Sequence, residues 1–285
     1  MSEKEDYSQY DIRPDVLNYD DIRTMVPKLD GHEKLVNWLL HLLSVDKVNG
    51  VHSRCCDTPG PEFVKRMLID DFKIKLRVDN REILERFKEG PFITVSNHPL
   101  GALDGIALIY LVTRIRPKFK VMVNMILNKI SAMRPNFIAV DAWASNDPAK
   151  RAVSVNGIRQ AIKQLREGEP VGFFPAGAMS KSTLCHGLQD RPWQDSVLQI
   201  IARAKVPVIP IYFHDRNSLW CDFLGHACWP ARSLRLPAEV FRKCGKTLHI
   251  SVGEPISVEE QAKFATPEEL GAYLRQKTYE LRSYK

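Results

Sequence analysis

From residue 91 onward, short apolar runs alternate with segments of helical periodicity, and this alternation limits the folds open to the chain. Such strand–helix alternation is typical of a largely parallel sheet covered by helices. We therefore predict the α/β class, with a mainly parallel sheet flanked by helices. The expected strands are 92–96, 119–124, 136–140, 170–175, 206–213 and 247–252, and the expected helices lie near 105–115, 125–133, 148–167, 194–205 and 267–283.

The chain before residue 91 follows a different pattern, because its apolar residues recur mainly at helical spacing. Residues 1–15 are polar, and residues 19–90 are expected to be helical. We therefore predict an N-terminal helical region over 1–90, a candidate membrane-binding or substrate-covering element, and an α/β domain over 91–285. One apolar face, in the helix expected at 32–45, is predicted to pack into the core: Leu35, Trp38, Leu39, Leu42 and Leu43.

The charge balance favours an anionic partner. The formal net charge is +7, from 41 basic and 34 acidic residues, which suits a membrane surface, an acidic carrier protein or nucleic acid. The basic stretch 114–120 has no accompanying nucleic-acid motif, so we expect no nucleic acid. The longest apolar stretches are far shorter than the ~20 residues that cross a bilayer, and the charged N-terminus is no secretory signal. We expect a peripheral protein on the cytoplasmic face of the inner membrane.

The six cysteines include no Cys-x-x-Cys pair, which favours a reducing compartment over a disulfide scaffold. Cys185 with His186, and Cys221 with His226 and Cys228, match no known zinc spacing. We therefore predict no metal site.

The segment from Ser96 to Gly105 joins an expected strand to an expected helix and carries a histidine and an aspartate, His98 and Asp104. The loop after a strand, at a helix N-terminus, is where α/β proteins tend to place their chemistry. A histidine held by a carboxylate can act as a general base for a hydroxyl, because the carboxylate fixes the tautomer and stabilises the imidazolium.

Three further expected strands carry motif residues at or near their carboxyl ends. Residues 136–140 lead into Asp141, and residues 170–175 lead into a glycine-containing turn at Gly177. The third strand, residues 206–213, contains prolines. The carboxyl ends of parallel strands meet at one edge of a sheet, so we expect these segments to lie near His98.

The order and spacing of these four blocks resemble the glycerolipid and lysophospholipid acyltransferase family over about residues 90–255. The family's blocks are Asn-His with an Asp after four residues, then Phe-Ile-Asp-Arg, Phe-Pro-Glu-Gly-Thr-Arg-Ser and Val-Pro-Ile-Ile-Pro-Val. The resemblance implies acyl transfer to a hydroxyl, with His98 as the base and Asp104 as the residue that orients it. It also implies substrate-binding residues on the same blocks: Asn97, Gly101, Asp141, Phe174, Pro175, Gly177, Ser180 and Lys181.

The departures from the family pattern point to a particular acceptor. Five residues separate His98 from Asp104, and the third block has Ala176 for Glu and Met179 for Arg, while the second block has no Arg. Arginine binds phosphate as a planar fork that methionine cannot imitate. The pattern His-Pro-Leu-Gly-x-Leu-Asp-Gly with Phe-Pro-Ala-Gly resembles the hemolysin-like branch that includes ornithine and glycine lipid O-acyltransferases. This resemblance implies that the acceptor is the 3-hydroxyl of an N-acylated amino acid.

The resemblance implies an acyl carrier protein or coenzyme A thioester as donor, a lyso-lipid acceptor, and no cofactor beyond the donor. Backbone N–H groups near Gly177 or at the start of the helix after Asp104 would stabilise the oxyanion. Lys181 and Arg191 are candidates for binding a carboxylate or the donor's phosphopantetheine. No covalent acyl-enzyme is required.

Three alternatives stay open from the sequence. One is a 1-acylglycerol-3-phosphate acyltransferase in which Lys181 replaces the missing arginines. The second is a hydrolase that uses His98, although the chain has no Gly-x-Ser-x-Gly elbow. The third is a non-catalytic lipid-binding homologue, against which both His98 and Asp104 are present.

Overall fold

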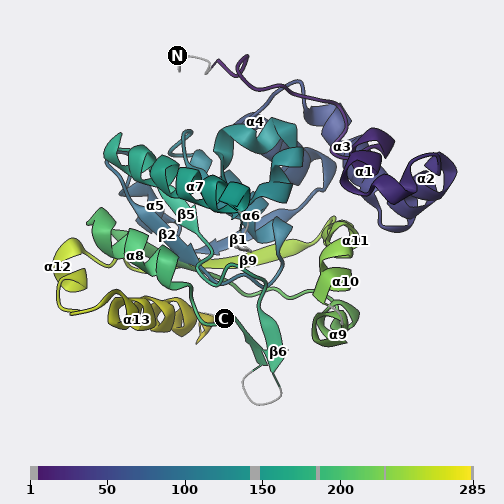
Figure 1. The fold of residues 1–285 in the computed structure, drawn as a ribbon. Helices are drawn as coiled ribbons and strands as arrows, with labels where there is room; N and C mark the ends of the chain where they lie inside the picture. The colour runs from purple at the N-terminus through teal and green to yellow at the C-terminus, as the bar shows by residue number, and fades with distance from the viewer. Residues whose placement is uncertain (1–5, 142–147, 184–186, 228, 284–285) are drawn as a thin grey trace.

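The structure is a computed structural model, and it describes residues 6–141, 148–183, 187–227 and 229–283 (Figure 1). Within these residues a seven-stranded sheet has the order β1-β9-β8-β2-β5-β3-β4. The expected α/β class is confirmed. The strands of this sheet are β1 (Lys75–Asp79), β2 (Ile93–Ser96), β3 (Lys120–Asn124), β4 (Phe137–Val140), β5 (Val171–Phe173), β8 (Val208–Phe213) and β9 (Thr247–Val252).

The sheet is mainly parallel. Strands β8, β2, β5, β3 and β4 run in one direction, so their carboxyl ends share one edge. Strand β9 is antiparallel to β8, and β1 is parallel to β9. All six strands expected from the sequence are therefore present, within two residues at their ends.

Strand β1 corrects the expectation that residues 19–90 are entirely helical. Its apolar side chains, Leu76 and Val78, alternate with charged ones, which is a strand pattern of only five residues. It forms the edge of the sheet by pairing with β9, about 170 residues further along the chain, with Leu76 opposite Leu248. A strand this short, with a partner this distant in sequence, gives little local signal.

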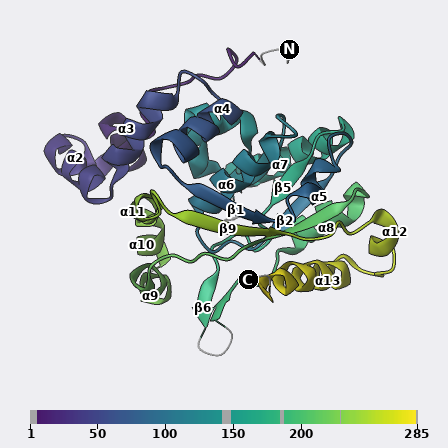
Figure 2. The same ribbon diagram turned by 180° about the vertical axis from the view of Figure 1, so that it is seen from behind.

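Helices cover both faces of the sheet, and Figures 1 and 2 show α6 and α13 on opposite sides of it. Alternation along β8 explains the two layers, because Ile209 and Ile211 face the core under α6 whereas Val208 faces the core under α8 and α13. The first face carries α4 (Pro61–Lys65), the π-helix η2 (Arg66–Asp71), α5 (Glu82–Glu85) and α6 (Ala102–Thr113), and the second carries α7 (Pro148–Arg166), α8 (Asp195–Ala204) and α13 (Pro267–Glu280).

The last long helix begins as its sequence predicts. The hydroxyl of Thr266 accepts a hydrogen bond from the Glu269 N–H at 3.2 Å, and Pro267 occupies the first helical position. The helix expected near 125–133 is instead two 3-10 helices, η3 (Met125–Lys129) and η4 (Ser131–Asn136), the second containing Pro135. Elements without a sequence prediction are β6 (Lys181–Thr183), β7 (Gly187–Gln189), α9 (Leu219–Ala227), α10 (Trp229–Leu234), α11 (Leu236–Arg242) and α12 (Val258–Gln261). The last residues of the helix expected near 267–283 form the 3-10 helix η5 (Leu281–Ser283).

The N-terminal helices α1 (Tyr19–Met25), α2 (Glu33–Leu42) and α3 (Val45–Cys55), with the 3-10 turn η1 (Pro27–Leu29), project from one side of the molecule (Figure 2). The prediction that the apolar face of α2 packs in the core is wrong. Trp38 is 58% exposed and Leu42 is 61% exposed, while Val36 is the buried residue of this helix. No helix in the described part of the chain is long and apolar enough to cross a membrane.

Candidate active site

The loop after β2 is fixed to the neighbouring strand by Asn97. Its side-chain amide donates to the Phe213 carbonyl at 2.9 Å, and its carbonyl oxygen accepts from the Phe213 N–H at 2.7 Å. Asn97 is 2% exposed. The amide predicted to bind substrate is thus used to hold the β2 loop against the end of β8.

The turn that follows brings His98 and Asp104 together. Gly101 has φ 75° and ψ −121°, a conformation open to glycine, and α6 begins directly after it. The Asp104 carboxylate folds back over the helix start and accepts from the N–H groups of Leu100 and Gly101 at 2.8 and 3.0 Å. In this position Asp104 Oδ2 lies 3.1 Å from His98 Nδ1. The five-residue spacing is therefore compatible with a histidine–carboxylate pair.

The two members of the pair have different environments. The Asp104 side chain is fully buried, whereas the His98 side chain is 19% exposed. Burial raises the pKa of Asp104, and the neighbouring His98 and the two backbone N–H groups oppose this effect. Because Nδ1 faces the carboxylate, Nε2 is the nitrogen left for a substrate, and the described residues give it no hydrogen-bond partner.

The third block packs directly against the histidine. The Phe174 and His98 rings lie 4.3 Å apart between centroids, at an interplanar angle of 34°. Gly177 has φ 62°, and its N–H donates to the Phe174 carbonyl at 2.9 Å. This N–H is therefore used inside the turn, so it is not one of the backbone groups near Gly177 that an oxyanion could use. Pro175 ties the turn to α8, because its carbonyl accepts from the Gln194 N–H.

Another predicted substrate-binding residue, Asp141, lies elsewhere. Asp141 follows β4, which is three strands away from β2, or roughly 14 Å at the usual strand spacing. Asp141 is therefore not brought into contact with His98. Lys181 begins β6 and is half-buried opposite Gln189, while Arg191 is exposed.

Ser180 lies beside the histidine but is only 1% exposed. Its N–H donates to the His98 carbonyl at 2.8 Å, and its hydroxyl donates to Asp190 Oδ1 at 2.5 Å. Arg232 donates to the Ser180 carbonyl at 2.8 Å and is itself almost fully buried. Sequence reasoning gave no role to Asp190 or Arg232, because neither is adjacent to a motif block that carries chemistry.

A second polar cluster lies where β1, β8 and β9 meet. Asp79, His214 and His249 offer ligand atoms within 4.8 Å of one another. The two imidazoles stack with centroids 3.9 Å apart and planes 11° apart, so their in-plane lone pairs do not converge on one ion. Asp79 Oδ2 instead accepts from the Ser251 hydroxyl at 2.8 Å and contacts His249 Nε2 at 2.5 Å. This geometry is that of a hydrogen-bonded network and does not fit a metal.

The cysteine–histidine groups weighed for zinc fall mainly outside the described residues. Cys185, His186 and Cys228 are not described, and neither is the side chain of His226. Cys221 is buried, which raises the pKa of its thiol.

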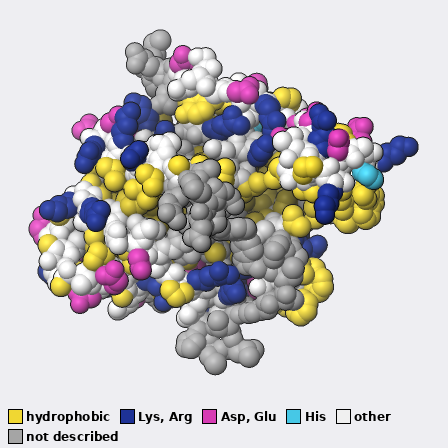
Figure 3. Space-filling model, in the orientation of Figure 1, with side chains coloured by type: hydrophobic (Ala, Val, Ile, Leu, Met, Phe, Trp, Pro, Cys, Tyr) yellow, Lys and Arg dark blue, Asp and Glu magenta, His cyan; other side chains and the backbone are white. Residues whose placement is uncertain are grey.

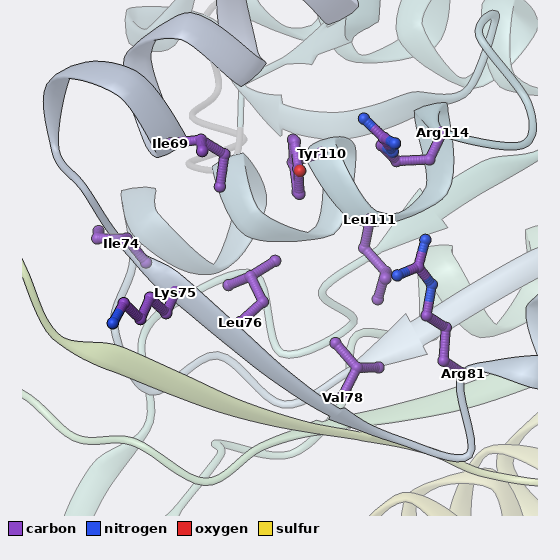
Figure 4. Close-up of a pocket in the computed structure, with 9 residues that line it drawn as sticks. All are labelled: Ile69, Ile74, Lys75, Leu76, Val78, Arg81, Tyr110, Leu111 and Arg114. Atoms are coloured by element: carbon purple, nitrogen blue, oxygen red, sulfur yellow. The ribbon is translucent and has the colours of Figure 1, made fainter.

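A cavity of about 350 Å³ lies between β1 and the C-terminal half of α6 (Figure 4). Apolar side chains such as Leu76 and Leu111 share its lining with three cations, Lys75, Arg81 and Arg114. Neither His98 nor Asp104 lines it, so this cavity is separate from the histidine–carboxylate pair.

Comparison with known proteins gives consistent results. The family model described as "Acyltransferase" matches residues 23–284. Two curated proteins, each named lyso-glycine lipid O-acyltransferase, are similar over most of their length. The one from Bacteroides thetaiotaomicron is 27% identical and covers 91% of this chain and 95% of its own; the one from Phocaeicola vulgatus is 24% identical and covers 87% of each.

Among solved structures, the 1-acyl-sn-glycerophosphate (LPA) acyltransferase PlsC from Thermotoga maritima shares the fold. Its TM-score is 0.51 and its sequence identity is 18%, with 87% of this chain and 89% of that chain covered.

Proposed function

This chain belongs to the acyltransferase family, and we propose that it transfers a fatty acyl group from an acyl thioester to the hydroxyl of a monoacylated amino-acid lipid. The favoured acceptor is a lyso-glycine lipid, the acceptor in the names of the two curated relatives. The observation that carries the proposal is the contact of 3.1 Å between His98 Nδ1 and the buried carboxylate of Asp104.

The reaction follows from this pair. His98 Nε2 accepts the proton of the acceptor hydroxyl while the hydroxyl oxygen attacks the thioester carbonyl carbon. Asp104 holds the proton on Nδ1 and stabilises the imidazolium that forms. When the tetrahedral intermediate collapses, the carbon–sulfur bond breaks and the imidazolium returns its proton to the leaving thiolate. The products are an ester and a free thiol, without a covalent acyl-enzyme.

The third block supports an acceptor without phosphate at this place. Ala176 and Met179 stand where the family has Glu and Arg, and the Met179 side chain packs against Gly101, where an added Cβ would meet its sulfur at 2.8 Å. This apolar contact offers no bidentate donor for phosphate. We assign Lys181, at the edge of the same segment, to the acceptor carboxylate or to the donor's phosphopantetheine.

We also propose that the protein works at a membrane surface on the cytoplasmic side, with acyl carrier protein or coenzyme A presenting the donor. Large apolar side chains are exposed on α2 and α9, and Figure 3 shows apolar surface on the side where these helices lie. A groove between them is lined by Leu42, Trp220 and Leu234, among others. Exposed tryptophans and leucines on neighbouring helices suit insertion into the boundary between lipid headgroups and acyl chains.

The direct test uses purified protein, radiolabelled acyl–acyl carrier protein or acyl-coenzyme A, and lyso-glycine lipid in mixed micelles. Mass spectrometry should show the diacylated lipid in amounts that depend on both substrates. The variant His98→Ala should lose transfer by at least about 10³-fold, as expected when a general base is removed, while still sedimenting with vesicles. Wild-type protein that binds the lyso-lipid but transfers nothing would contradict the proposal and support a lipid-binding homologue.

A further inference from the structure

We propose that Asp190 is a positioning residue of the acyl-transfer site, one that fixes the main chain of His98 through its carboxylate. The inference rests on the proposed function, since it concerns how the base of that reaction is held. Asp190 lies after β7, at the end of the hairpin formed by β6 and β7, and far in sequence from both His98 and Asp104.

The first argument is that both backbone polar groups of His98 are bound from this side. The His98 N–H donates to Asp190 Oδ1 at 3.2 Å. The His98 carbonyl accepts from the Ser180 N–H, and the Ser180 hydroxyl donates to the same Asp190 oxygen. Asp190, Ser180 and the His98 backbone therefore form a closed hydrogen-bonded ring behind the imidazole.

The second argument is that Asp190 is itself held rigidly. Its N–H donates to the Tyr279 hydroxyl at 2.7 Å, and Arg275 donates to its carbonyl at 3.2 Å. Both partners lie on α13, whose C-terminal end is close to the β6–β7 hairpin in Figures 1 and 2. The backbone of His98 is thus held in place by α13, on the face of the sheet opposite α6, as well as by its own loop.

The third argument is the cost of placing a carboxylate there. Asp190 is 6% exposed, and the groups that oppose the effect of this burial on its carboxyl pKa are the Ser180 hydroxyl, the His98 N–H and imidazole, and the Trp193 indole. Burial raises the pKa of Asp190, which shows that its surroundings disfavour the charge. Burying a carboxylate is costly and calls for an explanation. Accepting a hydrogen bond from the backbone N–H of His98, which no apolar side chain can do, provides that explanation.

The expected consequence is a loss in turnover rather than in binding. Asp190 does not contact the imidazole, so its removal leaves the substrate-binding surface intact but frees the backbone of the base. A displacement of about 1 Å in a reacting group costs up to roughly 10²-fold in rate. We expect Asp190→Ala to lower kcat by about 10- to 100-fold, with KM for acceptor and donor changed less than about threefold.

The conservative variant separates hydrogen bonding from charge. Asp190→Asn keeps an oxygen that can accept from both the His98 N–H and the Ser180 hydroxyl. It should recover most of the activity lost in Asp190→Ala, to within about fivefold of wild type. Tyr279→Phe removes the support from α13 and should give a smaller loss in kcat. Its matched control, Tyr273→Phe on the same helix, loses only a hydroxyl bonded to Glu260 and should leave kcat unchanged.

Hydrogen exchange supplies a readout that does not need the reaction. In Asp190→Ala and Tyr279→Phe, amide exchange should rise in the peptide containing His98 and remain unchanged in a peptide from β3. If wild type proves inactive, exchange still tests the hydrogen bonds while the proposed function has failed separately. The inference is overturned if Asp190→Ala keeps kcat within threefold, if Asp190→Asn is as impaired as Asp190→Ala, or if exchange rises equally throughout the sheet.

Discussion

Replacing Gly101 by alanine tests whether the turn between the histidine and the aspartate depends on a glycine conformation. Gly101 has φ 75° and ψ −121°, a region that residues with a Cβ occupy only under strain of about 1–3 kcal/mol. An alanine Cβ would also lie 2.8 Å from Met179 Sδ and 3.0 Å from Leu236 Cδ2, both at the ends of flexible side chains. We expect Gly101→Ala to lower the free energy of unfolding by about 2–3 kcal/mol, mostly through the backbone.

The effect on activity should exceed the effect on stability. The N–H groups of Leu100 and Gly101 hold Asp104 Oδ2, so any relaxation of the turn moves the carboxylate relative to His98. We expect kcat to fall by about 10²-fold in protein that is still folded at 25 °C. Urea unfolding followed by circular dichroism gives the stability change, and steady-state transfer to lyso-glycine lipid gives kcat.

Two variants make the test specific. Gly105→Ala adds the same methyl group inside α6, where the nearest contact is the Phe174 ring at 3.9 Å, and should stabilise the fold by up to about 1 kcal/mol. A double-mutant cycle of Gly101→Ala with Met179→Ala should show coupling below about 0.5 kcal/mol, because the strain lies in the backbone rather than in the side-chain contact. A Gly101→Ala protein with wild-type stability and kcat would refute the reasoning.

Three further predictions follow from the same structure. Asp104→Asn should lower kcat by at least about 10²-fold without lowering the melting temperature, because burial disfavours the charge that is removed; calorimetry and kinetics on one preparation check this, and a kcat within threefold of wild type would contradict it. Burial and the charge of a neighbouring imidazole lower the pKa of His214 to about 4. As pH drops from about 6.5 to 4, the unfolded chain therefore takes up this proton before the folded protein does, and the free energy of unfolding falls. His214→Gln should remove about 2 kcal/mol of the difference in unfolding free energy between pH 7 and pH 4.5, measured by urea unfolding, and an unchanged difference would exclude His214 as its source. Replacing the exposed Trp38 and Trp220 by alanine should weaken sedimentation with anionic vesicles by at least about tenfold while transfer to a micellar acceptor stays within threefold, and unaltered sedimentation would place the membrane contact elsewhere.

Much of the fold could be predicted because its signals are local. Each central strand is a short apolar run, and Thr266 and Pro267 mark the start of α13 within a single turn. Strand β1 was missed because it pairs at the sheet edge with a strand about 170 residues away. The exposure of Trp38 was misjudged for a related reason, since amphipathic spacing predicts an apolar face but not what covers it.

In the candidate site too, the contacts between residues near in sequence could be predicted and the contacts between distant residues could not. His98 and Asp104 could be paired from the sequence because one turn joins them and Gly101 can close it. Asp190 could not be found, since its contact with the His98 N–H depends on the placement of a hairpin with strands of three residues. The oxyanion site was expected near Gly177 or at the start of α6, and the sequence could not show that the N–H of Gly177 itself is used in a turn that closes onto Phe174.

The central claim is that the histidine–carboxylate pair serves an acceptor without phosphate, and the ratio of kcat/KM for lyso-glycine lipid over lysophosphatidate tests it most directly. Both acceptors should be assayed with matched acyl chains, one donor and the same micelles, with His98→Ala as the blank. We expect a ratio of at least about 10², because the third block provides no arginine for a phosphate. A ratio below one, with activity that still requires His98, would contradict the account of the acceptor and make Lys181 the first candidate for phosphate binding.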